Sequence, residues 1–518
     1  MGACRMSRRE FARRWTGVLA GMTVGQWGLP ALAGAAPVRG GTLSMSLGPD
    51  FVTLDPWYDV PGSEFRATPF EAPMRPNVRG TAYEPWLAEA VTESPDGLAV
   101  TLRMRRGIRF HNGRELTAAD VVWSVKRAMN SRTGAHLSDR FKLAKDAVQV
   151  DAYTLRITYT QRDPSKYVGL ANLFLYPQEA AQSIARKPVG TGPFKFDEWV
   201  PGDHLTVSRF NGYWRKGIPS LDRIVVKPLP DEESRALSLQ GGAVQLLMGL
   251  PLVDASRLSR TPGFAVYTSP PGPLFYSIIM NIEQSPFDDR LVRDAMGFAV
   301  DRDKINRIVF RGLGLMTQLP YPTSSWAYDP ALAGTYRYDP AKAKQLLVQA
   351  GHPNGVNIEL LIEGSSGPHL QLAQVYQQDL AAAGIRATLI PMPLPQYFQK
   401  LYSSEFAVVS HSTGETDLDP NGLFIGAACC RPFRNFFNIP ENADWFPHYR
   451  DLIYRARDEA DEATRKQLYH QILVIMQQQN WLIPVAWDQD WFGYRTSLRQ
   501  FRMDLHAHLW FDEAWVAR

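Results

Sequence analysis

The stretch GLAVTLRMRRGIRFHNGRELTAADVVWSVKRAMN at residues 97–130 contains a strand pattern, a turn and a helix pattern in close succession. The strand pattern places apolar side chains at every second position, namely Leu98, Val100, Leu102 and Met104. This period of two predicts a half-buried strand. Turn residues follow at 111–113, and Thr117 with Asp120 predicts the capped start of a helix. One apolar stripe on that helix, formed by Val121, Val122, Val125, Ala128 and Met129, completes a predicted α/β unit.

The sequence of this stretch resembles the signature of family 5 extracytoplasmic solute-binding proteins, which are the dipeptide, oligopeptide and nickel binders of ABC importers. That family shows a strand, an R-x-G-x-x-F-H-x-G turn, an L-T-A-x-D-V start and a helix ending near an Arg, as residues 97–130 do. Other family elements follow the same order along residues 39–518: G-G-T-L at 40–43, L-D-P at 54–56, G-T-G-P-F at 190–194 and P-F-D-D-x-x-V-R at 286–293.

The resemblance implies an α/β fold of the two-lobe, type II periplasmic-binding-protein kind, with a subdomain inserted in the first lobe. It places the lobe I core at 37–57, 190–272 and 485–518, the inserted subdomain at 58–189, and lobe II at 273–484. In the family, the ligand is held between lobes that close over it. The sequence after residue 275 agrees with this architecture, because it contains repeated strand–helix patterns. Such repeats predict mainly parallel strands with helices on the faces of the sheet.

Residues 1–36 have the pattern of an export signal. Residues 7–13, SRREFAR, fit the twin-arginine motif, and a weakly apolar run with small-residue cleavage candidates follows. An ordinary signal with a chance arginine pair is the alternative, and both place the mature chain in the periplasm. No Cys ends the apolar run, so we expect no lipid anchor. Removal of Cys4 would leave the adjacent Cys429 and Cys430, which we expect to be free thiols, with a vicinal disulfide or a soft-metal contact as alternatives.

The composition is that of a soluble globular protein of about three domain-sized units in 518 residues. The net charge of +4 is small for this length and argues against a nucleic-acid partner, which would favour a concentrated basic face. The sequence contains neither the Gly-x-Ser-x-Gly motif of hydrolases nor the HExxH motif of metalloproteases. The absence of a motif does not exclude an enzyme, because a catalytic triad is defined by its arrangement in space and not by the order of its residues in the chain.

The acid-rich stretch at 410–420, SHSTGETDLDP, is the main candidate for ligand binding. The resemblance implies that an acid after T-G pairs with the α-ammonium of the ligand. Here that position is Glu415, next to Thr413 and Gly414, with Asp417 and Asp419 nearby. A desolvated carboxylate provides a strong charge-assisted contact to a cation. The alternative is a surface turn in which Asp419 caps a helix.

The sequence departs from the dipeptide-binding pattern after the strand predicted at 358–362. Dipeptide binders have Arg-Pro-Tyr there, and the Arg clamps the ligand carboxylate, whereas this chain reads EGSSGPH at 363–369. We therefore expect a longer peptide, an amino-acid derivative or another polar or cationic solute rather than a free dipeptide. Further pocket candidates, for which core packing is the alternative, lie at predicted strand ends near lobe crossings: Trp57, Tyr58, Tyr276, Asn281, Trp487 and Trp491.

Metal binding is the second function considered. His411, beside the acid-rich stretch, could belong to a nickel, metal-chelate or haem carrier of the same fold. His506 and His508 would share a face of a strand, but no third ligand is evident, and we expect a surface strand there. We predict no metal, no cofactor and no catalytic residue. The expected protein is a monomer that delivers a peptide-like solute to the membrane subunits of an ABC permease, and an exported enzyme is the remaining alternative.

Overall fold

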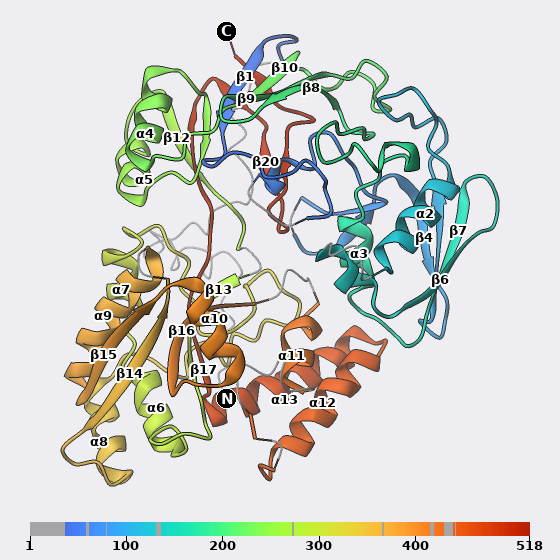
Figure 1. Cartoon of the computed structure of the whole chain (residues 1–518). Coiled ribbons are helices and arrows are strands. Elements are labelled where there is room, and N and C mark those ends of the chain that lie inside the picture. The colour runs from blue at the N-terminus through green and yellow to red at the C-terminus, as the bar shows by residue number, and fades with distance from the viewer. Residues whose placement is uncertain are drawn as a thin grey trace, which may run out of the picture.

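The computed structural model describes residues 37–58, 62–78, 80–130, 136–271, 274–364, 367–414, 419–428, 439–440 and 442–517. Figure 1 shows two α/β bodies, one above the other, and a smaller part, mainly cyan, beside the upper body. We call the upper body, built on a seven-stranded sheet, lobe I, and the lower body, built on a five-stranded sheet, lobe II. The smaller part contains a four-stranded sheet and is the inserted subdomain. The predicted two-lobe α/β fold is confirmed.

The lobe I sheet joins strands from the beginning, middle and end of the chain. In spatial order they are β12 (Phe264–Thr268), β18 (Trp491–Arg495), β11 (Leu246–Met248), β1 (Thr42–Ser46), β10 (Arg223–Val226), β9 (His204–Arg209) and β8 (Phe194–Val200). β1 runs parallel to β10 and β11, and the other neighbours are antiparallel. Helices α4 (Glu232–Gly241) and α5 (Leu252–Leu258) pack on this sheet through Leu239 and Leu258, which are fully buried. Two short strand pairs near the C-terminus complete the lobe: β19 (Leu498–Arg499) with β22 (Trp515–Val516), and β20 (Arg502–Met503) with β21 (Leu509–Trp510).

The inserted subdomain contains the strand and helix that the stretch at 97–130 predicts. Its sheet is β4 (Ala88–Glu93), β5 (Ala99–Met104), β7 (Thr154–Tyr159) and β6 (Ala144–Gln149), all antiparallel. Val100, Leu102 and Met104 on β5 are fully buried, as predicted, but Leu98 is 37% exposed because it lies in the turn before the strand. The other elements of this region are η1 (Ser63–Phe65), β2 (Met74–Pro76), β3 (Tyr83–Pro85), α2 (Ala118–Ala128), η3 (His136–Phe141), α3 (Lys166–Asn172) and η4 (Gln178–Ala180).

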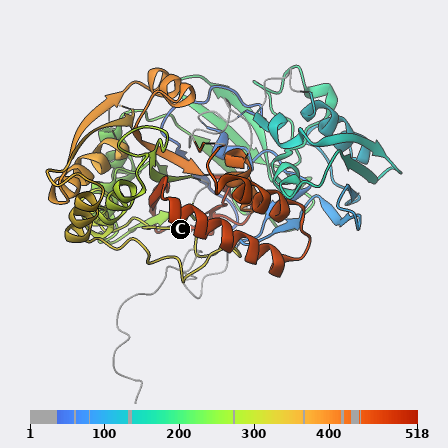
Figure 2. The ribbon, with the colours of Figure 1, turned by 90° about the horizontal axis from the view of Figure 1, so that it is seen from below.

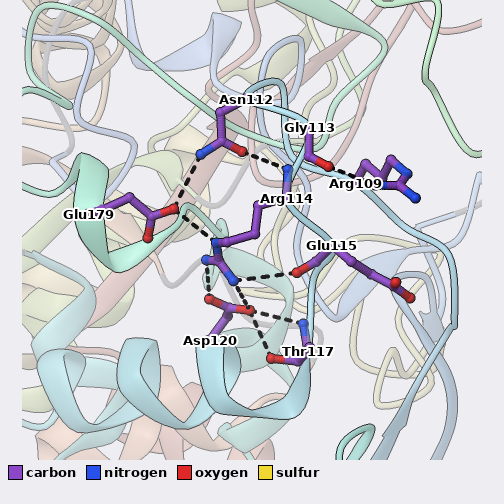
Figure 3. A network of polar contacts seen from close by, with 8 residues as sticks. All are labelled: Arg109, Asn112, Gly113, Arg114, Glu115, Thr117, Asp120 and Glu179. Carbon is purple, nitrogen blue, oxygen red and sulfur yellow. Dashed lines mark hydrogen bonds and ion pairs between the residues drawn. The ribbon is translucent and has the colours of Figure 1, made fainter.

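The start of α2 forms the predicted capping box. The carboxylate of Asp120 accepts the backbone N–H of Thr117 at 2.9 Å and its hydroxyl at 3.1 Å. Figure 3 shows that Arg114 binds the same carboxylate and also Glu179. Since Arg114 precedes the helix and Glu179 belongs to η4, the network ties the turn, α2 and η4 together. Asp120 is buried, so its negative charge depends on these partners.

Replacing Asp120 by Ala is expected to lower the unfolding free energy of the inserted subdomain by about 1–2 kcal/mol, because the change removes a helix cap and leaves Arg114 without its buried partner. The matched control is Asp146→Ala, since Asp146 forms an exposed pair with Lys126 in the same subdomain. Thermal denaturation followed by circular dichroism measures both changes. Equal melting temperatures for the two variants would contradict the assigned role of Asp120.

The strands of the lobe II sheet are mainly parallel, as predicted. Its strands are β15 (Ile385–Met392), β14 (Val356–Glu363), β16 (Val408–Gly414), β13 (Leu274–Met280) and β17 (Leu482–Trp487). Only β13 runs against the others. Its helices are α6 (Arg290–Phe298), α7 (Arg302–Ile308), α8 (Pro340–Gln349), α9 (Pro368–Ala382), α10 (Leu394–Ser403), α11 (Asn421–Ala428), α12 (Phe446–Asp458) and α13 (Glu462–Gln479). Asp289, Asp301 and Asp339 cap α6, α7 and α8, because each side chain accepts a backbone N–H at the start of its helix.

Helices α11, α12 and α13 extend from lobe II toward the inserted subdomain. Figure 1 shows them below α3, and Figure 2, seen from below, shows the red helices between the lobe II sheet and the cyan subdomain. The charge of Asp419, just before α11, acts on Asp163, just before α3. Lobe II therefore approaches the subdomain as well as the core of lobe I.

Two chain crossings connect the sheets of the two lobes. The first follows β12, and the second, residues 488–490, lies between β17 and β18. Ser269 binds the second crossing twice: its backbone N–H donates to the carbonyl of Asp490, and its hydroxyl accepts the N–H of Asp490, both at 2.9 Å. The predicted domain boundaries stay a prediction, and β17 extends across the last of them, at 484/485.

Within the described ranges, no helix has both the length and the apolar character needed to cross a membrane.

Candidate functional site

Ionisable side chains gather at one edge of the lobe II sheet. Because β14, β16 and β17 run in the same direction, their carboxyl ends meet at this edge, together with the start of the antiparallel β13. Glu363 ends β14, His411 lies on β16, Asp488 follows β17 and Tyr276 lies near the start of β13. The chain crosses to lobe I from the same edge.

Glu363 is the centre of this group. Its Oε2 accepts a hydrogen bond from Nδ1 of His411 at 2.8 Å and from the backbone N–H of Ser412 at 3.0 Å. Burial opposes ionisation of Glu363, but these donors and the nearby imidazoles outweigh it and lower the pKa of the carboxyl. Since the ionised carboxylate can only accept, Nδ1 of His411 must carry its proton.

His369, at the start of α9, completes the group on the β14 side. Its ring nitrogens contact the hydroxyls of Ser410 at 3.1 Å and Ser412 at 3.0 Å, and its ring meets the ring of Tyr276 edge-on at 4.9 Å. Burial lowers the pKa of His369 to about 4, although Glu363 opposes the shift. The imidazole is therefore neutral at physiological pH and can bind both as donor and as acceptor.

Asp488 and Asp490 provide two further carboxyl groups on the second crossing. The hydroxyl of Tyr276 donates to Asp488 at 2.8 Å, whereas the Asp490 side chain has no hydrogen-bond partner among the described residues. Burial raises the pKa of both groups; Tyr276 opposes the shift at Asp488. For Asp490, the charges of Asp488 and Glu64 add to burial and raise the pKa to about 7. Glu64 belongs to η1, whose Phe65 packs in the apolar cluster of lobe I, so Asp490 lies where the two lobes approach each other.

Of the acids predicted in the 410–420 stretch, Glu415 and Asp417 lie outside the described residues. Asp419 is half-buried, and its carboxylate forms two 2.8 Å contacts with the guanidinium of Arg465. It also accepts the backbone N–H of Asn421 at the start of α11, at 3.0 Å, as expected for a helix cap. Arg465 thus neutralises Asp419 within lobe II.

The remaining predicted residues of this stretch belong to β16. The hydroxyl of Thr413 is buried and contacts that of Ser277 on β13 at 2.6 Å. Gly414 is the last residue of β16 and pairs with Leu274. His411, Thr413 and Gly414 therefore follow one another along the strand that leads to the edge, while Cys429 and Cys430 lie outside the described residues.

The aromatic and amide candidates are not all brought together. Tyr276 and Trp487 lie at the edge, where Trp487 packs against Phe275 with ring centroids 5.4 Å apart. Trp491 begins β18 in the lobe I sheet and packs against the apolar cluster under α4 and α5. Asn281 follows the opposite end of β13, and its buried amide donates to the carbonyl of Phe406 at 3.0 Å. Its place in the sheet separates it from the other candidates.

Trp57 and Tyr58 pack in the apolar core of the inserted subdomain, close to lobe I. Trp57 is buried, and its indole N–H donates to the carbonyl of Phe174 at 3.0 Å. Tyr58 is half-buried and lines a pocket that also contains Asp55, Ser63 and Arg66. These two residues face the inserted subdomain rather than the lobe II edge.

The expectation of a surface strand at His506 and His508 is wrong. Both residues are buried in the turn between β20 and β21, where Asp504 accepts the backbone N–H groups of both and contacts Nδ1 of His508 at 3.2 Å. His506 also contacts the hydroxyl of Tyr83 at 3.0 Å. A buried carboxylate stabilises the turn, which period-two reasoning does not detect. In the part of the chain that the structure describes, no cluster of three or more His, Cys, Asp or Glu side chains could hold a metal ion.

Sequence reasoning missed Glu363 and His369 as partners of His411, and Asp488 and Asp490 as neighbours of Tyr276. One signal was present, because the acids of the D-Q-D triplet at 488–490 directly follow an apolar strand. No local pattern could show that this triplet, the end of β14 and the start of α9 meet at one edge.

Comparison with known proteins identifies the family of this chain. Residues 82–434, more than half of the sequence, match the family model described as bacterial extracellular solute-binding proteins, family 5 Middle. The chain belongs to this family. As a family 5 protein, it is the solute-binding component of an ABC importer.

Curated relatives of this family 5 protein are binding proteins. It is 31% identical over 443 residues to the glutathione-binding protein GsiB of Pectobacterium atrosepticum, covering 82% of this chain and 84% of the relative. It is 30% identical over 470 residues to the glutathione-binding protein GsiB of Escherichia coli O1:K1, covering 85% and 88%. Both matches span most of the two proteins, so the similarity extends beyond the signature at 97–130.

Solved structures show the same fold. HbpA2 of Haemophilus parasuis has a TM-score of 0.83 at 22% identity, covering 92% of this chain and 100% of that protein. NikA of Brucella suis, in complex with Fe(III)-EDTA, has a TM-score of 0.81 at 21% identity, with coverage of 92% and 100%. DppA of Helicobacter pylori, in complex with the peptide STSA, has a TM-score of 0.75 at 24% identity, with coverage of 93% and 99%. At these identities, the likeness establishes the fold alone.

Proposed function

We propose that this family 5 protein captures a peptide-like or other small cationic solute between its lobes and delivers it unaltered to the membrane subunits of an ABC permease. The observation that carries this proposal is the Asp490 carboxyl group, which lies beside Asp488 where the lobes approach each other and has no hydrogen-bond partner among the described residues. A half-buried carboxylate that lacks a partner favours a cation, and a free ammonium group provides both charge and donors.

Lobe closure would build the complete site. The edge of the lobe II sheet would hold the ammonium end of the solute through Asp490 and Asp488, with Glu415 and Asp417 of the acid-rich stretch as predicted additional acids. Tyr276 and Trp487 would cover the body of the solute from the same edge. The paired crossings, joined through Ser269, provide a short hinge, and a hinge needs few residues to change their backbone angles.

The export and assembly of the protein are part of the same proposal. We infer that residues 1–36 are a twin-arginine signal, that the mature protein works in the periplasm without a lipid anchor, and that it works as a monomer. The residue pattern at 7–13 supports the export route. We further infer that the protein is not an enzyme, which agrees with relatives that are named as binding proteins.

The names of relatives suggest the first solutes to test. Those of about 30% identity are named as glutathione-binding, and a fold neighbour was solved with a peptide. Glutathione and small peptides share a free ammonium group and at least one carboxylate. Isothermal titration of the purified mature protein with glutathione and with di- and tripeptides should reveal a micromolar or tighter ligand, and mass spectrometry should find a related solute co-purifying from the native host.

Failure of every peptide and cationic solute to bind or to raise the melting temperature would contradict the proposal. If the cargo is a metal chelate, protein purified without a tag would carry stoichiometric metal, and the His411→Ala variant would lose it. Turnover of a bound solute into a product would instead reveal an enzyme. Each result is distinct, so one set of purified samples separates the three functions.

A further inference from the structure

A hollow of about 450 Å³ lies in lobe II, and none of the residues named at the lobe II edge lines it. Its walls are formed by α7, by the loop that precedes α8 and by Gln318 between them. Figure 1 places α7 at the upper left of lobe II, on the side away from the inserted subdomain. Three arginines line the hollow, namely Arg302 and Arg307 of α7 and Arg337 of the loop before α8. The hollow is therefore distinct from the candidate site.

The charge of Arg302 is not paired with an acid among the described residues. Its Nε donates to the carbonyl of Thr317 at 2.8 Å, and its Nη2 donates to the carbonyl of Pro484 at 2.6 Å. These oxygens satisfy N–H groups but carry no net charge. Burial lowers the pKa of Arg302 to about 10, so the guanidinium remains charged at physiological pH. A half-buried cation that is held by carbonyl groups leaves a positive potential in the wall of the hollow.

Arg307 and Arg337 add two further positive charges to the lining. Both side chains are exposed, and neither guanidinium forms a hydrogen bond or an ion pair within the described part of the chain. The acids of the same lining are Asp301 and Asp303. Asp301 is engaged as the cap of α7, where its side chain accepts a backbone N–H. Three guanidinium groups against two carboxylates leave the lining with an excess of positive charge, which favours an anion.

Two uncharged side chains add donors to the lining. Gln318 uses its Oε1 to accept the backbone N–H of Tyr336 at 3.1 Å, so its amide N–H groups remain available to a ligand. The side chain of Tyr338 is 40% exposed at the hollow. Burial raises the pKa of Tyr338, so its hydroxyl stays protonated and can donate. The hollow thus presents guanidinium, amide and hydroxyl donors from three segments of the chain.

Donors that come from several walls suit a tetrahedral oxyanion better than a planar one. A carboxylate has two oxygens in one plane, whereas a phosphate group spreads its oxygens in three dimensions. Each guanidinium fork can bind two of these oxygens at once, and the contacts are strengthened by opposite charge. The volume of the hollow also leaves room for the organic group that a phosphate ester carries.

We propose that this hollow binds a phosphate group, with Arg302, Arg307 and Arg337 as its cationic donors. The inference concerns a second site and goes beyond the proposed function, because it is independent of the solute held between the lobes. The phosphate belongs either to a free phosphate ester or to an anionic lipid headgroup at the membrane surface. Both sources present the same chemistry to the arginines, so the experiment has one arm for each.

The first arm is isothermal titration of the unaltered mature protein with glycerol 3-phosphate, which should bind in a saturable manner. A variant that combines Arg307→Gln with Arg337→Gln should weaken this binding at least about tenfold, because two charge-assisted contacts are lost. Both side chains are exposed, so the fold should persist. Arg302 stays unaltered in this variant, since its contacts hold β17. Glycerate, which has a carboxylate in place of the phosphate, should bind at least about tenfold more weakly than glycerol 3-phosphate.

The second arm is co-sedimentation with phosphatidylglycerol vesicles, with phosphatidylcholine vesicles as the reference. Arg311→Gln is the matched control in both arms, because Arg311 is an exposed arginine just after α7 that does not line the hollow. Binding that the double variant loses and the control retains supports the inference, and the arm in which it occurs identifies the source of the phosphate.

Three results would overturn the inference. They are the absence of binding in both arms, equal affinity for glycerate and glycerol 3-phosphate, and equal loss of binding in the double variant and in Arg311→Gln. None of them alters the expected binding of peptides between the lobes, so the proposed function would still stand.

Discussion

Asp490→Asn is expected to weaken binding of an ammonium-bearing solute by roughly 10- to 100-fold, because the change removes a charge-assisted contact while keeping the shape of the side chain. Asp490 is suited to this role since its side chain has no hydrogen-bond partner among the described residues. Isothermal titration with the tightest-binding peptide measures the effect. Asp451→Asn is the control, because Asp451 is an exposed acid on α12 in the same lobe.

The pH dependence of the unaltered protein gives a second readout for Asp490. The pKa is raised from 3.8 to about 7 in the folded state, so the folded protein binds more protons than the unfolded chain between these values. The unfolding free energy of the unliganded protein should therefore fall as the pH rises through this window, whereas solute affinity should rise as the carboxyl ionises. Asp490→Asn should remove both trends and raise the melting temperature of the unliganded protein at pH 8. Unchanged pH profiles in this variant would refute the assignment.

Arg465→Met is expected to cost about 3 kcal/mol of unfolding free energy in lobe II, because it leaves the half-buried carboxylate of Asp419 without its two 2.8 Å partners. The change also removes the contact of Arg465 with the ring of Trp326, 5.1 Å from the guanidinium carbon. Methionine keeps much of the length of the side chain, so the loss of charge dominates. Thermal and urea denaturation followed by circular dichroism measure the effect.

Arg455→Met is the matched control for this change. Arg455 pairs with Asp451 one helical turn away on α12, but both side chains are more than half exposed. A surface pair of this kind contributes about 0.5 kcal/mol or less, since water screens both charges. Equal loss of stability in the two variants would show that the burial of the Asp419–Arg465 pair has no special importance.

Local features of the fold were predictable because they depend on neighbouring residues. The capping box of Thr117 and Asp120 needs only residues three apart, and the caps at Asp289, Asp301 and Asp339 are equally local. The failures also have local causes. Leu98 continues the alternation of β5 in sequence but lies in the preceding turn, and His506 and His508 have strand-like spacing but belong to a turn built around Asp504.

The candidate site was predictable only in part. His411 was proposed because it lies beside the acid-rich stretch, and Tyr276 because it was expected at a strand end; the structure places both in strands that lead to this edge. Their partners were not found, since Glu363 follows a different strand and Asp488 lies more than two hundred residues from Tyr276.

The sequence by itself determined the family, the alternation of strands and helices, and the positions of the helix caps, because these depend on motifs and on spacing along the chain. The tertiary structure decided which charged groups remain available to a solute. Arg465 neutralises Asp419, and His411 and Ser412 hold Glu363, whereas Asp490 has no such donor among the described residues. The pKa of a carboxyl group and its capacity to bind depend on burial and on charges a few ångströms away, and those charges come from distant parts of the chain.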